Sequence, residues 1–284
     1  MTEKGAEKIM KNIKNKINKK KIIAAIFILL FLIFLISLLI LYLVAFAPYY
    51  VRNSGMGDTC AIDPSHLLQT EKIPAILMYH SISGKASQVT AGNFEKQIRY
   101  LAENGYAFLF PDEIYDSDEY DKPIIITFDD GYRDNYEIAF EILKKYNAKA
   151  TIFIATDNIG KDGFLTEDQI KELEASGIAR VEPHSRTHTD FSQITLNGVR
   201  EQIETSNAAL KKITGRDHKV FAYPYGGVNG EVREIAGEYY DVALATGNGN
   251  RRDTMELYRQ SITNRCMLLN MTAFKMQAAV TYLD

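Results

Sequence analysis

The stretch IIITFDDG at residues 124–131 joins a short apolar run to two carboxylates and a glycine. Runs of β-branched and aromatic residues of this length are typical of strands that are buried on both faces. Adjacent residues at the end of a strand point in different directions. One of the two carboxylates, Asp129 and Asp130, can therefore hold a metal ion while the other acts as a base. Asp-Asp-Gly is also an ordinary turn, so its meaning depends on the rest of the chain.

Six further runs have the same strand character, and helical patterns separate most of them. The runs are residues 75–79, 107–110, 150–154, 180–182, 220–223 and 241–245, with helices expected around residues 94–101, 136–143, 166–177 and 195–214. Alternating strands and helices predict an α/β fold in which helices wrap parallel strands. Seven strands favour a barrel over an open sheet, and in both folds functional groups gather beyond the C-terminal ends of the strands.

A second motif, PHSRTH at residues 183–188, places His184 and His188 four residues apart directly after a predicted strand. On a turn of helix the two rings would share a face, and neutral imidazoles at this spacing chelate divalent ions. With Asp130 they would form a site of two histidines and one carboxylate that leaves positions open for water and substrate. The alternative is a chance pair of surface histidines.

Two weaker motifs also follow strands. In FAYPYG, at residues 221–226, the side chains of Tyr223, Pro224 and Tyr225 suit a wall for a sugar ring, although the same sequence can be a plain aromatic turn. His80 ends the apolar run ILMYHS at residues 76–81. A lone histidine in that place is more often a structural group than a catalyst.

Together, TFDDG at residues 127–131, the histidine pair and YPYG at residues 223–226 resemble the polysaccharide deacetylase family, carbohydrate esterase family 4 with its NodB-homology domain. The resemblance covers about residues 73–284. It implies a distorted (β/α)7 barrel in which Asp129 is the general base. It also implies that Asp130, His184 and His188 bind one divalent metal ion, usually Zn²⁺, and that the backbone amide of Tyr225 helps to bind the oxyanion.

The place of Tyr79-His80 ahead of the double aspartate resembles a permuted branch of that family, typified by deacetylases of poly-β-1,6-N-acetylglucosamine. In that branch a late histidine motif is moved to the front, which makes His80 the expected general acid. The chain also departs from the family pattern. Much of the family has an arginine two residues before the proline, whereas this chain has Ala222, so the usual charged partner of the base is missing.

The resemblance implies a metal-dependent hydrolase that removes N-acetyl groups from N-acetylglucosamine-containing envelope polysaccharide, either peptidoglycan or poly-N-acetylglucosamine, and releases acetate. Two alternatives stay open: a catalytically silent carbohydrate-binding envelope protein, and a deacylase of another acetylated sugar. The silent protein is disfavoured because the base, the acid and all three metal ligands of the family pattern are present together.

Residues 22–46 form an apolar run without charge, which is long enough to cross about 30 Å of hydrocarbon as a helix. Residues 1–21 hold eight lysines and two glutamates, so this tail is expected to stay in the cytoplasm. The predicted organisation is a cytoplasmic tail (1–21), a single-pass transmembrane anchor (22–46), an extracytoplasmic stalk (47–72) and a deacetylase domain (73–284). A cleaved signal peptide is the alternative, although the apolar run is longer than such peptides need.

The net charge also limits the partners of the domain. The whole chain carries −3, and the tail of residues 1–21 carries +6, which leaves −9 for the remainder. An acidic domain argues against nucleic acid as a partner and leaves neutral substrates open. Cys60 and Cys266 could form a disulfide in an oxidising exterior or remain as two thiols.

Overall fold

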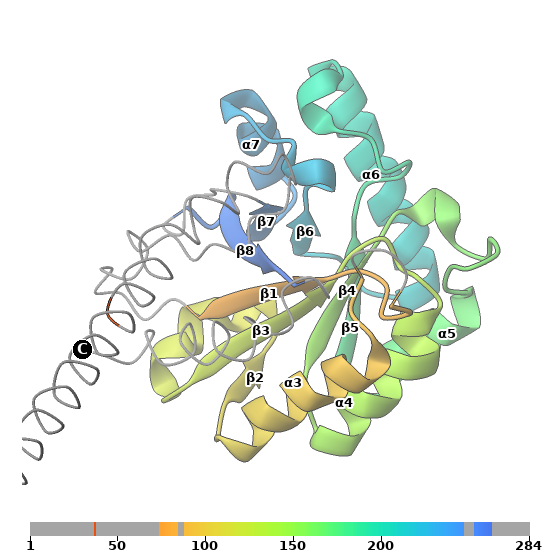
Figure 1. Ribbon diagram of the computed structural model, residues 1–284. Helices are drawn as coiled ribbons and strands as arrows, with labels where there is room; N and C mark the ends of the chain where they lie inside the picture. The colour runs from red at the N-terminus through yellow and green to blue at the C-terminus, as the bar shows by residue number, and fades with distance from the viewer. Residues whose placement is uncertain (1–36, 38–73, 85–87, 247–252, 263–284) are drawn as a thin grey trace, which may run out of the picture. The chain divides into compact units, whose positions relative to one another are not determined.

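The computed structural model describes Ser37 and residues 74–84, 88–246 and 253–262 (Figure 1). The chain divides into two compact units, Met1–Ala61 and Ile62–Asp284, and all described residues except Ser37 belong to the second unit. The predicted anchor, the stalk and both cysteines lie outside the described residues, again except for Ser37. Within the described part of the chain, no helix is both long enough and apolar enough to span a membrane.

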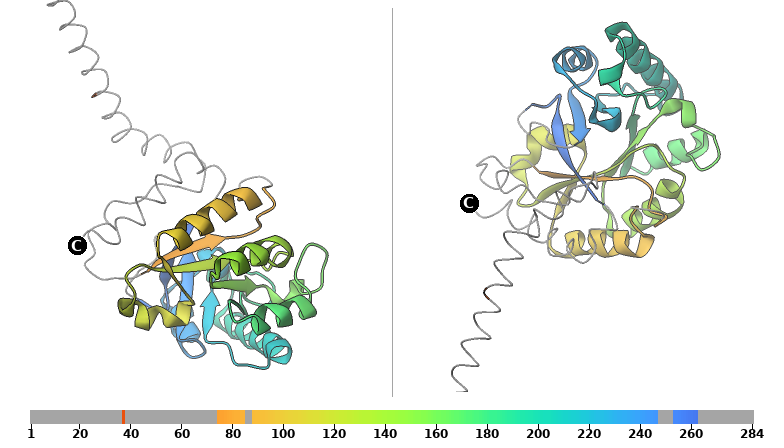
Figure 2. Two further views of the ribbon diagram at one scale, coloured as in Figure 1. Left: turned by 90° about the horizontal axis from the view of Figure 1, so that it is seen from below. Right: turned by 45° about the horizontal axis from the view of Figure 1, so that its top comes forward.

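Parallel strands form the centre of the second unit. Their bounds are β1 Ala75–Tyr79, β2 Ala107–Leu109, β3 Pro123–Phe128, β4 Ala150–Ile154, β5 Ala179–Pro183, β6 Val220–Ala222, β7 Val242–Thr246 and β8 Leu257–Ser261. Seven of them follow the order β5-β4-β3-β1-β8-β7-β6, and β2 pairs with β3 beside this path. The two ends of the path, β5 and β6, approach each other, so the sheet curves into a nearly closed barrel (Figure 2). The predicted α/β class with parallel strands is confirmed.

The seven strands predicted from sequence all form, with bounds that agree within one or two residues. The strand β8 was not predicted. Its sequence LYRQS contains only one aliphatic residue, and its burial alternates, with Leu257 and Arg259 buried and their neighbours partly exposed. A half-polar strand of this kind lacks the continuous apolar run by which the other strands were recognised.

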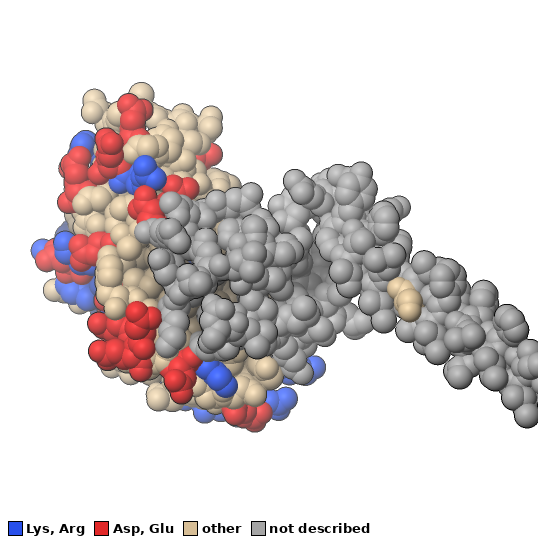
Figure 3. Space-filling view, turned by 90° about the vertical axis from the view of Figure 1, so that its left-hand side faces the viewer, with Lys and Arg blue, Asp and Glu red and all other residues tan. Residues whose placement is uncertain are grey.

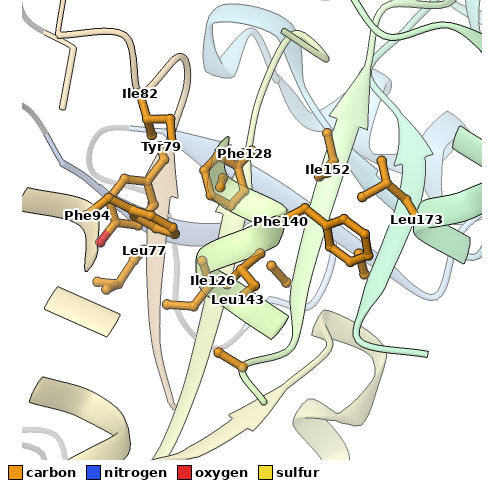
Figure 4. Packing of buried hydrophobic residues seen from close by; sticks show 14 of the residues in the cluster. Leu77, Tyr79, Ile82, Phe94, Ile126, Phe128, Phe140, Leu143, Ile152 and Leu173 are labelled. Atoms are coloured by element: carbon orange, nitrogen blue, oxygen red, sulfur yellow. The ribbon is translucent and has the colours of Figure 1, made fainter. Parts of the chain in front are cut away.

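Both faces of the central strands are covered, as their apolar sequences require. Ile76 of β1 and Ile125 of β3 point into the barrel, where they belong to one buried cluster. The alternate residues, such as Leu77 and Phe128, pack outward in a second cluster against Phe94 of helix α3, Ala91–Glu103 (Figure 4). Because the strands are buried along their length, polar groups can reach solvent mainly at the strand ends.

The helices lie around the outside of the strands (Figures 1 and 2). The α-helices are α3 Ala91–Glu103, α4 Glu141–Tyr146, α5 Glu167–Ala175, α6 Leu196–Thr214 and α7 Gly230–Gly237. The 3₁₀- and π-helices are η2 Pro111–Glu119, η3 Asn135–Phe140, η4 Thr156–Asn158, η5 Phe191–Gln193 and η6 Pro224–Gly226. The predicted capping box at Thr166 and Gln169 is present at the start of α5. Helix η3 is a π-helix that continues directly into α4. Such wide turns are rare and occur frequently at functional sites.

Side chains bridge the seam between β5 and β6. The buried Glu182 of β5 accepts from Arg216 at 2.8 Å and pairs with His218 at 3.0 Å. Further along the seam, His184 Nδ1 lies 2.7 Å from the carbonyl oxygen of Ala222 on β6. Because a carbonyl oxygen can only accept, Nδ1 is the donor in this contact. Polar side chains therefore hold β5 and β6 together where the barrel closes, and one of them, His184, belongs to the predicted metal site.

Acidic side chains gather in several places on the face drawn in Figure 3. In the segment Pro111–Glu119, the side chains of Asp116, Asp118 and Glu119 are exposed. These exposed carboxylates agree with the acidic charge expected for this part of the chain.

Candidate metal centre and active site

The double aspartate lies in a left-handed turn directly after β3. Asp130 has φ 72° and Gly131 has φ 76°. A non-glycine residue rarely adopts this conformation, although aspartate tolerates it better than most. A Cβ atom on Gly131 would lie 2.9 Å from a side-chain carbon of Ile154, so only glycine fits there. The turn separates the two carboxylates, as expected from sequence.

The two histidines lie in a loop after β5 and not on a helical turn, so that part of the prediction is wrong. Ser185 and His188 both have positive φ, 64° and 59°. The loop is held by polar side chains: the amide of His188 donates to Ser185 Oγ at 3.0 Å, and the amide of Arg186 donates to Gln202 of helix α6 at 3.1 Å. The compact loop nevertheless brings the two imidazole rings to 5.0 Å between their centroids.

Asp130, His184 and His188 converge. One donor atom from each lies within 4.8 Å of the other two. His188 Nε2 is 3.0 Å from Asp130 Oδ1, and His184 Nε2 is 3.8 Å from the same oxygen. Because the Nδ1 atom of His184 donates to the Ala222 carbonyl, its Nε2 atom is left free to act as a ligand. The sequence prediction that these three side chains lie together is therefore matched by the geometry.

The protonation of His184 and Asp130 suits a divalent cation, whereas the hydrogen bond to Asp130 raises the pKa of His188. Burial lowers the pKa of His184, which favours the neutral ring that a metal needs. Burial would raise the pKa of Asp130, but its hydrogen bond with His188 and the nearby His184 and His80 bring it to about 2. Among the described residues, Asp130 Oδ1 is buried without a hydrogen bond of good geometry. A buried carboxylate oxygen beside two imidazole nitrogens is a donor set that fits zinc or a similar ion.

The second aspartate, Asp129, forms a buried ion pair with Arg259 of β8. The guanidinium donates two parallel hydrogen bonds to the carboxylate, at 2.6 and 2.7 Å. Its other contacts are Thr127 Oγ1 and the carbonyl oxygen of Ala245, both at 3.3 Å. Arg259 is 1% exposed and Asp129 2%, so the pair is shielded from water. The charged partner that is missing at Ala222 is supplied from a different strand.

This pair keeps the buried carboxylate ionised. Burial alone would raise the pKa of Asp129, but Arg259, with smaller contributions from His184 and His80, brings the pKa below its ordinary value. An ionised carboxylate beside a metal site can accept a proton from water. Sequence reasoning did not identify Arg259. The signal that could have found it is the alternation of Leu257, Arg259 and Ser261, which places the arginine on the same face of β8 as a buried leucine.

The four other residues predicted for the site do not all lie beside the metal ligands expected from sequence. His80 follows β1 and lies close enough to Asp129 and Asp130 to lower the pKa of both. Tyr225 is 68% exposed, and its ring lies 4.6 Å from that of His188. Tyr223 is fully buried in the core, where its hydroxyl donates to the Met255 carbonyl at 2.9 Å, so its side chain does not face the site. Pro224 is also buried, at the start of the η6 turn.

The chain is similar to known proteins. The family model that matches residues 116–240 is described as polysaccharide deacetylase. The Bacillus subtilis (strain 168) protein YxkH, whose name assigns it to the polysaccharide deacetylases, is 36% identical over 197 residues, which are 66% of this chain and 70% of that protein.

A second relative is the poly-beta-1,6-N-acetyl-D-glucosamine N-deacetylase of Staphylococcus aureus (strain N315). It is 31% identical over 183 residues, and the match covers 56% of this chain and 62% of that protein. The crystal structure of a polysaccharide deacetylase from Bacillus cereus superposes with a TM-score of 0.64 at 31% identity, covering 70% of this chain and 67% of that one.

Replacing Arg259 should move the pH dependence of turnover. In Arg259→Met, burial acts on Asp129 without the guanidinium that offsets it, so the acidic limb of the rate-against-pH profile is expected to move to higher pH. Breaking a buried pair should also lower the free energy of unfolding by about 3–5 kcal/mol. In the wild type the pKa of Asp129 is lower in the folded state. Its stabilising contribution is therefore present above the unfolded-state pKa and is lost as the pH falls through the folded-state pKa.

Arg259→Lys keeps a charge without the two parallel hydrogen bonds, so its acidic limb should move less. Arg200→Met is the matched control, because Arg200 forms a two-point ion pair with Glu238 at the surface. It should leave the profile unchanged. An acidic limb that stays in place in Arg259→Met would show that Arg259 does not control the ionisation of Asp129.

Proposed function

Because the chain belongs to the polysaccharide deacetylase family, we propose that it is a metal-dependent hydrolase that removes N-acetyl groups from N-acetylglucosamine-containing envelope polysaccharide and releases acetate. The observation that carries the proposal is that two adjacent carboxylates, those of Asp129 and Asp130, lie in different environments. Asp129 is buried and held ionised by Arg259, whereas the Oδ1 atom of Asp130 faces the Nε2 atoms of His184 and His188.

Hydrolysis of an amide needs an activated water, a polarised carbonyl and a proton donor for the leaving nitrogen. A divalent cation held by Asp130, His184 and His188 would supply Lewis acidity for the first two needs. Asp129 accepts a proton from the attacking water, since it is ionised and its carboxylate lies 3.9 Å from the nearest ring nitrogen of His184. His80 donates a proton to the departing amine, and the backbone amide of Tyr225 donates a hydrogen bond to the carbonyl oxygen as negative charge develops.

The substrate class rests on relatives and on charge. The Staphylococcus aureus relative is named for poly-β-1,6-N-acetyl-D-glucosamine, so this polymer is one proposed substrate. Peptidoglycan, which also contains N-acetylglucosamine, is the other. Both present acetamido groups that carry no charge. The exposed carboxylates at Asp116, Asp118 and Glu119 do not oppose a neutral glycan, whereas they would repel nucleic acid. The exposed ring of Tyr225 beside His188 offers an apolar face for a sugar.

The function is tested by acetate release from three polymers: peptidoglycan, poly-β-1,6-N-acetylglucosamine and chitin-like oligomers. We expect release from at least one of the first two, and loss of release when a chelator removes the metal. Asp129→Asn should bind metal as the wild type does but lose about 10²–10⁴ in rate, because it removes a base and no ligand.

His184→Ala should instead lose the metal, since only two protein donors remain. Metal content per protein, measured by elemental analysis, separates the two variants. Asp129→Asn with full activity, or a wild type that cleaves none of the polymers, would refute the proposal.

The acid role of His80 is tested with two leaving groups. His80→Ala should retain the metal and lose rate on the acetamide, because an amine must be protonated as it leaves. An activated acetyl ester should lose much less rate, since its leaving group departs as an anion. Equal losses on both substrates would show that His80 does not protonate the leaving group.

We propose further that the apolar run of residues 22–46 anchors the protein in the cell membrane, with the N-terminus in the cytoplasm and the catalytic domain outside. The support is the lysine-rich tail before the run. The protein should fractionate with membranes and be cleaved by protease added to intact cells. A soluble form that begins at Pro48 would indicate a cleaved signal peptide instead.

A further inference from the structure

The loop that carries His80 is held by two adjacent side chains, Asp134 and Asn135, at the start of the π-helix η3. Ser81 Oγ donates to Asp134 Oδ2 at 2.5 Å, and the backbone amides of Ile82 and Ser83 also donate to this carboxylate. Asn135 Nδ2 donates to the carbonyl oxygen of His80 at 2.9 Å. Two neighbouring residues thus bind four successive residues of the loop after β1.

The amide of Asn135 has a defined orientation. Its nitrogen faces two acceptors, the His80 carbonyl oxygen and Asp134 Oδ1 at 3.2 Å, so the assignment of nitrogen and oxygen is settled by the contacts. Asn135 is fully buried, and within the described residues its Oδ1 atom has no hydrogen-bond partner. Burying an amide oxygen without a hydrogen bond is unfavourable, so we infer that the bond donated by the amide nitrogen of Asn135 is the one that matters for the structure.

The loop is fixed on both sides of His80. The amide of Asp129 donates to the carbonyl oxygen of Tyr79 at 2.9 Å, and Asn135 holds the next carbonyl oxygen, that of His80 itself. The first contact comes from the proposed base. The second comes from a residue six positions later, after the chain has passed through the left-handed turn at Asp130 and Gly131. The backbone of His80 is therefore tied directly to the segment that carries both catalytic carboxylates.

We propose that Asp134 and Asn135 are positioning residues for His80, which fix the loop backbone and so set the distance between its ring and the leaving nitrogen. The inference rests on the proposed function in one respect, the role of His80 as proton donor. Neither residue needs to contact the substrate. Their effect on the reaction passes through His80, because a displacement of about 1 Å of a reacting group can lower a rate by about 10²-fold.

The test is a double-mutant cycle. Asp134→Asn keeps the shape of the side chain but replaces one acceptor by a donor that faces the Ser81 hydroxyl and the loop amides. In the wild-type background it should lower kcat for the acetamide by about 10- to 100-fold, with a smaller loss for the activated ester and with KM and metal content unchanged. In the His80→Ala background the same substitution should have less than about a twofold effect, because the group it positions is absent.

One control and two further variants complete the test. Asp162→Asn changes an exposed aspartate in the loop after β4, paired only loosely with Arg133 at 3.4 Å, and should leave both rates unchanged. Ser81→Ala is the milder variant if Asp134→Asn fails to fold, because it removes one donor to the same carboxylate. Asn135→Asp tests the second contact by placing an acceptor against the His80 carbonyl oxygen.

Equal losses for Asp134→Asn in the two backgrounds would overturn the inference, as would loss of the metal, because either result would assign the contact to general stability. If His80→Ala impairs amide cleavage and neither Asp134→Asn nor Asn135→Asp does, the positioning inference alone is wrong. If His80→Ala itself has no effect, the acid role is wrong and the positioning inference is wrong with it.

Discussion

The ion pair between Asp129 and Arg259 is the interaction on which the interior of the barrel depends. Both side chains are nearly inaccessible to water, and a buried charge without a partner would destabilise the fold by several kcal/mol. The pair joins the end of β3 to β8, across the intervening strand β1. Strand β8 therefore does more than complete the strand order. It brings the guanidinium of Arg259, which contributes most to keeping the buried carboxylate of Asp129 ionised.

The proposed metal ligands depend on the barrel in a different way. The β5 and β6 strands close the barrel through side chains, and one of these contacts is the bond from His184 Nδ1 to the Ala222 carbonyl. The same bond directs His184 Nε2 toward Asp130. The contact that closes the barrel between β5 and β6 therefore also orients the ring of His184, because a shift of β6 would rotate that ring. A short side chain at position 222 is compatible with this arrangement, because the arginine that binds Asp129 enters from β8.

The sequence predicted the apolar part of the fold well and the polar part less well. Strands such as β3 and β4 were recognised because burial on both faces requires continuous apolar residues. Strand β8 was missed because its inward face carries Arg259, whose partner lies 130 residues earlier in the chain. The helical turn expected at His184 and His188 was wrong, since nothing in the sequence marks the left-handed conformation of Ser185. The positions of Asp130, His184 and His188 in the sequence were still enough to predict that they lie together, because they follow parallel strands whose C-terminal ends meet at one end of the barrel.

The adjacent carboxylates of Asp129 and Asp130 are not interchangeable, and the reason is geometric. Asp129 continues the inward face of β3, as Thr127 does, and both of its oxygens accept from Arg259. A cation that bound Asp129 would compete with that guanidinium. Asp130 is turned by its left-handed backbone toward the histidines, and its Oδ1 atom is left without a good hydrogen bond. The lowered pKa of Asp129 makes it a weaker base than a free carboxylate, but it keeps the carboxylate in the ionised form that its proposed role as base requires.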